Sequence, residues 1–204
     1  RINAVADNVA FTKKRGNDVI VVVSAMGKAT DNLIALADSV SRTQPGREMD
    51  MLLTTGERQT AALMTMALAD RGIQAISFTG SQVGIITDTA HRKAKIIEVK
   101  GDRVRQSLRE GKVCVIAGFQ GVDERGDITT LGRGGSDTTA VAMAAALGAA
   151  LLVASLGFRS ADMGLCAAFP LGTHFLWHLL NGLLVYLIVR GLLLNLPVSS
   201  RQSG

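Results

Sequence analysis

Short runs of β-branched residues alternate with helical patterns over most of the chain. The run Val-Ile-Val-Val-Val-Ser-Ala at 19–25 is typical of a strand that is buried on both faces of a parallel sheet. Similar runs at 75–80 and 112–119 predict two further strands, separated by segments with apolar residues at helical spacing. Because parallel neighbours need crossover connections, this alternation predicts an α/β fold with an open, mostly parallel sheet layered by helices.

Four helices are predicted around these strands, at residues 1–15, 30–40, 49–72 and 102–111. Thr30 or Asp31 is the expected N-cap of the second helix, since both side chains can accept a hydrogen bond from a first-turn amide. We expect the third helix to break or kink near Gly56 and to stop at Gly72.

Formal charge divides the chain into two parts. The whole chain has 22 Lys and Arg against 17 Asp and Glu, and within residues 1–150 the positive charges are spread singly among acids. Because no basic cluster is interleaved with aromatic residues, we expect no nucleic-acid binding. Residues 163–189 hold no charged residue and are long enough to cross a membrane, with Trp177 and Tyr186 as interface groups. The alternative is a buried helix that completes a soluble core.

Residues 138–158 form another uncharged span. One interpretation is a helix that begins at Ser136 or Asp137, ends near Gly148 and is followed by a buried strand. The other is a transmembrane segment, because the length suffices to cross a bilayer. The alanine-rich composition and the position of Gly148 favour the first interpretation.

The segment Thr-Leu-Gly-Arg-Gly-Gly-Ser-Asp at 130–137 places three glycines around an arginine, just before a predicted helix. Glycines let backbone amides approach a phosphate closely, and a helix N-terminus favours an anion. Asp137 would then orient a lysine or a magnesium ion. The alternative is a tight turn in which the aspartate serves only as an N-cap.

Polar side chains elsewhere strengthen this prediction of a ligand site. Ser24 and Thr30 follow the carboxyl end of a predicted strand, where open α/β sheets bind ligands. Glu57 lies beside a glycine in an otherwise apolar helical region.

Together these strings resemble aspartate kinases, of the amino-acid kinase family. The resemblance covers residues 1–149, through VVVSAMGKATDNL, REMDMLLTTGERQ, FTGSQVGIITD and GFQGVDERGDITTLGRGGSDTTAV. It implies transfer of the γ-phosphoryl group of ATP, with Mg²⁺, to the side-chain carboxylate of L-aspartate, the first step toward lysine, threonine and methionine. It also implies a cytoplasmic location for this part and a homodimer.

The resemblance assigns roles to residues that match the motifs. Arg133 would grip the substrate carboxylate with two hydrogen bonds, and Glu57 would accept the substrate ammonium group. Asp137 would organise the phosphoryl-transfer centre, where catalysis is mostly positioning and charge stabilisation. Hydroxyl contacts would come from Ser24, Thr30 and Ser136, and nucleotide contacts from Gly132, Gly134 and Gly135.

Two motifs of the family are not found in the chain. A lysine motif that neutralises the transferring phosphate would lie before Arg1, and a nucleotide-binding segment would begin after residue 149. Because a single stabilising donor can be worth several powers of ten in rate, we expect impaired kinase activity.

The end of the chain has a resemblance of its own. Residues 158–190 resemble the last transmembrane part of the alkaline ceramidase family, in which His174 and His178 would bind zinc beside a third histidine. The two histidines share one helix face, but a catalytic zinc site normally needs three protein ligands. We therefore expect no functional zinc site.

The leading hypothesis is a chimera of an aspartate kinase-like core at 1–149 and a hydrophobic tail at 150–204, which contacts a membrane through residues 163–189. One alternative is a non-catalytic aspartate-binding or pairing module on a membrane-type tail. Another is a remnant of a zinc-dependent membrane amidase.

Overall fold

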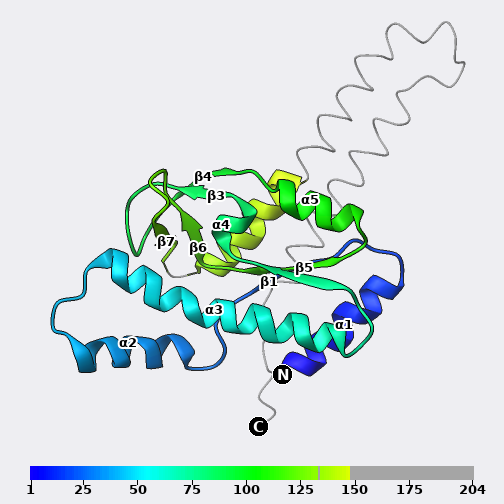
Figure 1. The fold of residues 1–204 in the computed structure, drawn as a ribbon, viewed down its shortest axis with the longest axis horizontal. Helices are drawn as coiled ribbons and strands as arrows, with labels where there is room; N and C mark the ends of the chain where they lie inside the picture. The colour runs from blue at the N-terminus through cyan, green and yellow to red at the C-terminus, as the bar shows by residue number, and fades with distance from the viewer. Residues whose placement is uncertain (133, 148–204) are drawn as a thin grey trace, which may run out of the picture. The chain divides into compact units, whose positions relative to one another are not determined.

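A computed structural model describes residues 1–132 and 134–147. Most of the described residues belong to one compact unit, Arg1–Ala140 (Figure 1). The elements of this unit are α1 (Ile2–Lys14), β1 (Ile20–Val23), α2 (Ala29–Val40), α3 (Gly46–Ala69), β2 (Ala75–Phe78), α4 (Gly80–Val83), β3 (Ile85–Thr87), β4 (Ile96–Val99), α5 (Asp102–Arg109), β5 (Val113–Ala117), β6 (Gln120–Val122) and β7 (Ile128–Thr130). Residues 135–147 form a further helix.

A three-stranded parallel sheet in the order β1-β5-β2 confirms the predicted parallel arrangement. Every residue of β5 is buried, because this central strand has a neighbour on each side. The expectation that the strand at 19–25 is buried on both faces is wrong for most of its length. Strand β1 has only one partner strand in the described part of the chain, and of its residues only Val23 is buried.

A second sheet, in the order β4-β3-β6-β7, departs from the mostly parallel prediction. Its pairs β3-β4 and β6-β7 are antiparallel, and only β3-β6 is parallel. Strands β6 and β7 form a hairpin whose turn is closed by a hydrogen bond from the amide of Asp123 to the carbonyl of Asp127 at 2.9 Å. The side chain of Asp123 also accepts hydrogen bonds from the amides of Arg125 and Asp127, which is how a short polar side chain stabilises a tight turn.

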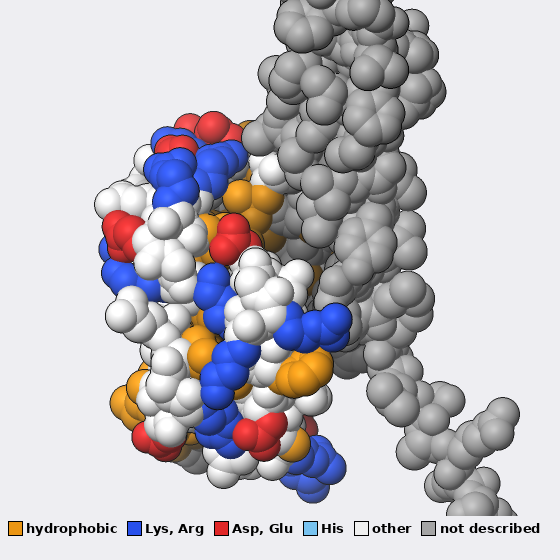
Figure 2. Space-filling view, turned by 90° about the vertical axis from the view of Figure 1, so that its right-hand side faces the viewer, with side chains coloured by type: hydrophobic (Ala, Val, Ile, Leu, Met, Phe, Trp, Pro, Cys, Tyr) orange, Lys and Arg blue, Asp and Glu red, His pale blue; other side chains and the backbone are white. Residues whose placement is uncertain are grey.

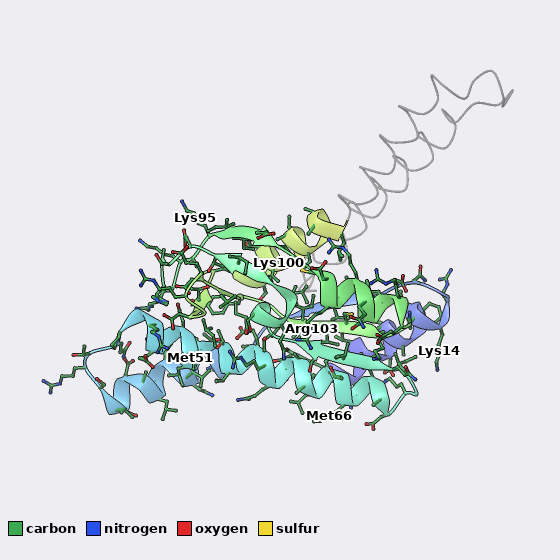
Figure 3. The ribbon with its side chains drawn as sticks, turned by 45° about the horizontal axis from the view of Figure 1, so that its top comes forward. Lys14, Met51, Met66, Lys95, Lys100 and Arg103 are labelled. Carbon is green, nitrogen blue, oxygen red and sulfur yellow. The ribbon has the colours of Figure 1, made fainter. Side chains whose placement is uncertain are left out.

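Helices α1 and α3 lie on one side of the parallel sheet and α5 lies on the other (Figure 1). Apolar residues at helical spacing on α1, namely Ala6, Val9 and Ala10, are buried in a cluster with residues of α3 and the sheet. The side of α3 that faces away from the sheet exposes Met51 and Met66 (Figure 3). The hydrophobic core therefore lies between α1, α3 and the strands.

The predicted helices are present, with two corrections to their details. Helix α2 begins at Ala29 after Lys28, and no side chain caps it, so neither Thr30 nor Asp31 is the N-cap; both lie in its first turn. Helix α3 runs without interruption through Gly56, so the expected break there is wrong.

Gly56 instead allows α3 to pack closely against the loop after β1. A Cβ atom at Gly56 would lie 2.9 Å from the Cβ of Ala25 in the loop after β1, closer than real Cβ atoms approach. The stop near Gly72 is confirmed, because Gly72 takes the left-handed conformation at φ +70° just after the helix.

Lys and Arg side chains are interspersed with Asp and Glu on the face shown in Figure 2. Several exposed charges are paired, as in the ion pairs Lys13–Asp18, Arg71–Asp7 and Lys112–Glu110. Among the described residues, no helix has both the length and the apolar character that a membrane crossing requires. The predicted tail at 150–204, with the uncharged span 163–189, lies outside the described residues.

Candidate active site

The carboxyl ends of β1 and β5 lie side by side and form the edge of the candidate site. The amide of Gly118, just after β5, donates to the carbonyl of Val23 at 2.9 Å. Ser24 follows Val23 directly and is exposed at this edge. Thr30 lies further along, half-buried in the first turn of α2. The structure thus places Ser24 where parallel α/β sheets bind ligands.

Glu57 reaches the same edge from α3. Its side chain is buried, with 3% of the residue exposed, and Oε1 accepts a hydrogen bond from the amide of Ala25 at 3.2 Å. The other oxygen, Oε2, is buried and has no hydrogen-bond partner within residues 1–132 and 134–147. Burial raises the pKa of Glu57, and the amides of Glu57 and Ala25 offset part of that rise. A ligand with a positive N–H donor would satisfy the free oxygen and stabilise the charged carboxylate.

The glycine loop leads into the helix at 135–147. Gly132 and Gly134 have φ values of +77° and +73°, a backbone conformation that residues with a Cβ rarely adopt. The amide of Gly135 donates to the carbonyl of Gly132 at 3.1 Å, and Gly135 is buried. The helix begins at residue 135, one position before the predicted start at Ser136. Arg133 lies outside the described residues.

The start of this helix packs directly on the end of β5. A Cβ atom at Gly118 would lie 2.8 Å from Oγ and 2.9 Å from Cα of Ser136, so the absence of a side chain at Gly118 lets the helix approach. The amide of Phe119 donates to Oγ1 of Thr139 at 3.2 Å, which ties the strand end to the next helical turn. Asp137 is exposed. Of the predicted site residues, Ser24, Glu57 and Ser136 therefore meet at one sheet edge.

Asp50 is a buried charged residue that sequence reasoning missed. It lies on α3 two turns before Glu57, and hydrogen bonds from His91, Arg92 and Thr130 satisfy its carboxylate. An aspartate two turns from a predicted functional glutamate, on the same face of the helix, was the signal that could have identified it.

Within the described part of the chain, no three His, Cys, Asp or Glu side chains are grouped so that they could hold a metal ion. His174 and His178, the histidines of the predicted tail, lie outside that part.

Comparison with known proteins shows to which family the chain belongs. Residues 1–155 match the model of the amino acid kinase family. The chain belongs to the amino acid kinase family. The parallel sheet layered by helices is accordingly the amino acid kinase fold. No finding supports the predicted ceramidase-like segment at 158–190, which begins beyond the matched residues.

Curated relatives of the chain include aspartokinases. The chain is 59% identical to an aspartokinase of Corynebacterium efficiens over 150 residues, 73% of this chain and 36% of the relative. An aspartokinase of Bacillus sp. (strain MGA3) is 58% identical over 147 residues, 72% of this chain and again 36% of the relative. The chain thus spans about a third of the length of these curated relatives.

Solved structures that are similar to the chain also include aspartate kinases. The aspartate kinase of Synechocystis is similar with a TM-score of 0.61 and 52% sequence identity, over 72% of this chain and 24% of that one. An E. coli aspartokinase III structure in complex with lysine and aspartate gives a TM-score of 0.50 and 32% identity, over 57% of this chain and 27% of that one.

Proposed function

We propose that this chain carries an aspartate kinase-type site, in which the γ-phosphoryl group of ATP is transferred to the side-chain carboxylate of L-aspartate. The products would be 4-phospho-L-aspartate and ADP. The observation that carries the proposal is the buried Glu57 carboxylate at the carboxyl edge of the sheet, with one oxygen bound to the loop after β1 and the other without a partner in the described part of the chain. Identities of 58–59% to aspartokinases support the choice of substrate.

In this proposal, the ends of the substrate are recognised by opposite charges. The ammonium group of aspartate donates to Oε2 of Glu57, which replaces the missing partner and lowers the cost of burying the charge. Arg133 donates to a substrate carboxylate in a bidentate pair, a geometry that the guanidinium fork favours. Ser24, Thr30 and Ser136 contribute hydroxyl hydrogen bonds.

The residues after β7 fit the phosphate end of a nucleotide. Gly134 and Asp137 are exposed, and they lie at a helix N-terminus, whose dipole favours an anion. A bound Mg²⁺ would neutralise phosphate charge there, and the exposed carboxylate of Asp137 would hold it. In the transfer itself, an oxygen of the substrate carboxylate forms a bond to the γ-phosphorus, and the bond from that phosphorus to ADP breaks.

Calorimetric titration of the full chain with L-aspartate tests the recognition step. We expect saturable binding that is lost in Glu57→Gln, which keeps the size of the side chain but not its charge. The matched control is Glu48→Gln, on the same helix, because Glu48 is exposed and pairs only with Arg47 among the described residues. Binding without any ADP formation would favour the non-catalytic aspartate-binding alternative. Absence of binding by the folded protein would contradict the proposal.

A further inference from the structure

The carboxylate of Asp50 lies wholly inside the protein and connects α3 to the segments around the glycine loop. Asp50 has 0% exposure, and three groups donate to it. Nδ1 of His91 lies 2.8 Å from Oδ2, the amide of Arg92 lies 3.1 Å from both oxygens, and Oγ1 of Thr130 lies 2.6 Å from Oδ1. A buried carboxylate is expensive unless it is satisfied in this way, so the contacts hold one another in place.

The bonds from Asp50 fix the shape of the loop between β3 and β4. Arg92 has φ +67°, a conformation that costs energy for a residue with a side chain and persists only where its surroundings impose it. The amide of Arg92 donates to Asp50, and the amide of Ala94 donates to the carbonyl of Thr130 at 2.8 Å. The loop is thus attached both to α3 and to the end of β7.

This loop in turn sets the path of the glycine loop. The carbonyl oxygen of Arg92 lies 3.2 Å from the point where a Cβ atom of Gly132 would stand, so the two backbones are in close contact. Gly132 comes two residues after Thr130, the residue that donates to Asp50, and directly before Arg133. We therefore expect a change in the Asp50 contacts to reach the backbone at Gly132, the residue before Arg133.

We propose that Asp50 is a positioning residue, which fixes the spacing between Glu57 on α3 and Gly132, the residue that precedes Arg133 in the sequence. The inference rests on the proposed function for its consequence, since Glu57 and Arg133 would bind opposite ends of aspartate. Asp50 and Glu57 lie on one continuous helix, so bonds from the loop to Asp50 also set its distance from Glu57. Small displacements of such paired groups have large effects on binding and catalysis.

The variant Asp50→Asn tests this role, because an amide has only one acceptor oxygen and cannot accept all three donors. We expect amide hydrogen exchange in residues 88–94 and 130–132 to become about 10-fold faster or more, with exchange at the Glu57 turn unchanged. The affinity for L-aspartate should fall by about 10-fold or more. In an Arg133→Ala background the same change should alter affinity by less than about 2-fold, because Asp50 acts through the loop that carries Arg133.

Thr129→Val is the matched control. Thr129 is the neighbour of Thr130 on β7, and its hydroxyl makes an equally buried hydrogen bond, 2.6 Å from Oγ1 of Thr87. This variant should lose stability but keep wild-type exchange in residues 130–132 and wild-type aspartate affinity. If Asp50→Asn does not fold, Thr130→Val removes one donor to Asp50 and should give a smaller effect in the same direction.

Two results would overturn the inference: wild-type exchange of the glycine loop in Asp50→Asn, or an equal loss of affinity with and without Arg133. If the wild-type protein binds no aspartate, the proposed function fails, and hydrogen exchange alone decides whether Asp50 positions the loop. The failures of the two proposals are thus distinguishable.

Discussion

Oε1 of Glu57 accepts a hydrogen bond from the backbone amide of Ala25 at 3.2 Å, which joins α3 to the loop after β1. The same carboxylate keeps Oε2 buried without a partner in the described part of the chain. One side chain therefore fixes two elements of the sheet edge and leaves an acceptor for a ligand. Because a buried acceptor without a partner costs free energy, we expect Glu57 to lower the stability of the folded protein.

The free energies of unfolding of Glu57→Gln and wild type, compared at several pH values, should reveal this cost. Burial raises the pKa of Glu57 in the folded protein above its ordinary value of 4.5, so the folded state binds more protons than the unfolded state between these two values. The contribution of Glu57 to stability is complete below pH 4.5 and is lost as pH rises through the raised pKa. The difference in free energy of unfolding between Glu57→Gln and wild type should therefore grow in favour of the variant as pH rises to about 7. Urea unfolding at a series of pH values measures it, and a difference that stays constant with pH would contradict the prediction.

Gly56→Ala should destabilise the protein even though alanine is the better helix former. The substitution gains about 1 kcal/mol of helix propensity, but the new Cβ meets Ala25 and such overpacking costs about 1–3 kcal/mol. In an Ala25→Gly background the obstacle is gone, so the same substitution should stabilise by about 1 kcal/mol. Urea denaturation of wild type, the two single variants and the double variant measures these changes in stability. A destabilisation of equal size in both backgrounds would show that the contact with Ala25 is not its cause.

Gly118→Ala should disturb the candidate site more than its small volume suggests. The added Cβ would lie 2.9 Å from Cα of Ser136, so the start of the helix at 135–147 must shift. We expect a loss of about 1–3 kcal/mol in stability together with weaker aspartate binding. Gly16→Ala is the control, because φ is +83° there and no atom lies within 4 Å of the added Cβ. It should lose about 1 kcal/mol to backbone strain and keep its affinity. An unchanged affinity in Gly118→Ala would contradict the proposed role of this close packing.

The thiol of Cys114 should be unreactive until the protein unfolds. Cys114 is buried in β5, and burial raises its pKa to about 11 from the ordinary 9.0. At about pH 8 this shift alone lowers the thiolate fraction by about 100-fold, and reagent access is blocked as well. Labelling with a disulfide reagent in a Cys166→Ser background measures the rate. If the native protein is labelled as fast as the protein in urea, Cys114 is accessible in the folded state and the prediction is wrong.

The sequence predicted those parts of the fold that depend on local patterns. Strand β5 follows from its continuous apolar run, and helix α1 follows from apolar residues at helical spacing. Strand β3 is only three residues long, and Glu98 interrupts the apolar run of β4, so neither gives a clear strand pattern. Helix α4 had a local signal that was overlooked, the reciprocal capping box of Thr79 and Gln82.

Features that depend on distant residues could not be predicted in the same way. The continuity of α3 depends on Gly56 meeting Ala25, and the role of Asp50 depends on partners 41 to 80 residues away. The strand-end position of Ser24 and the burial of Glu57 are visible in the structure, whereas their contacts with aspartate stay predictions, as do those of Thr30 and Ser136.

The most direct test of the central claim is ADP formation by the full chain, with MgATP, at increasing concentrations of L-aspartate. We predict ADP formation that rises with L-aspartate and saturates, with kcat/KM lower by about 100-fold or more in Glu57→Gln and unchanged in Glu48→Gln. Folded protein that forms no ADP, or forms it at the same rate without L-aspartate, would contradict the claim.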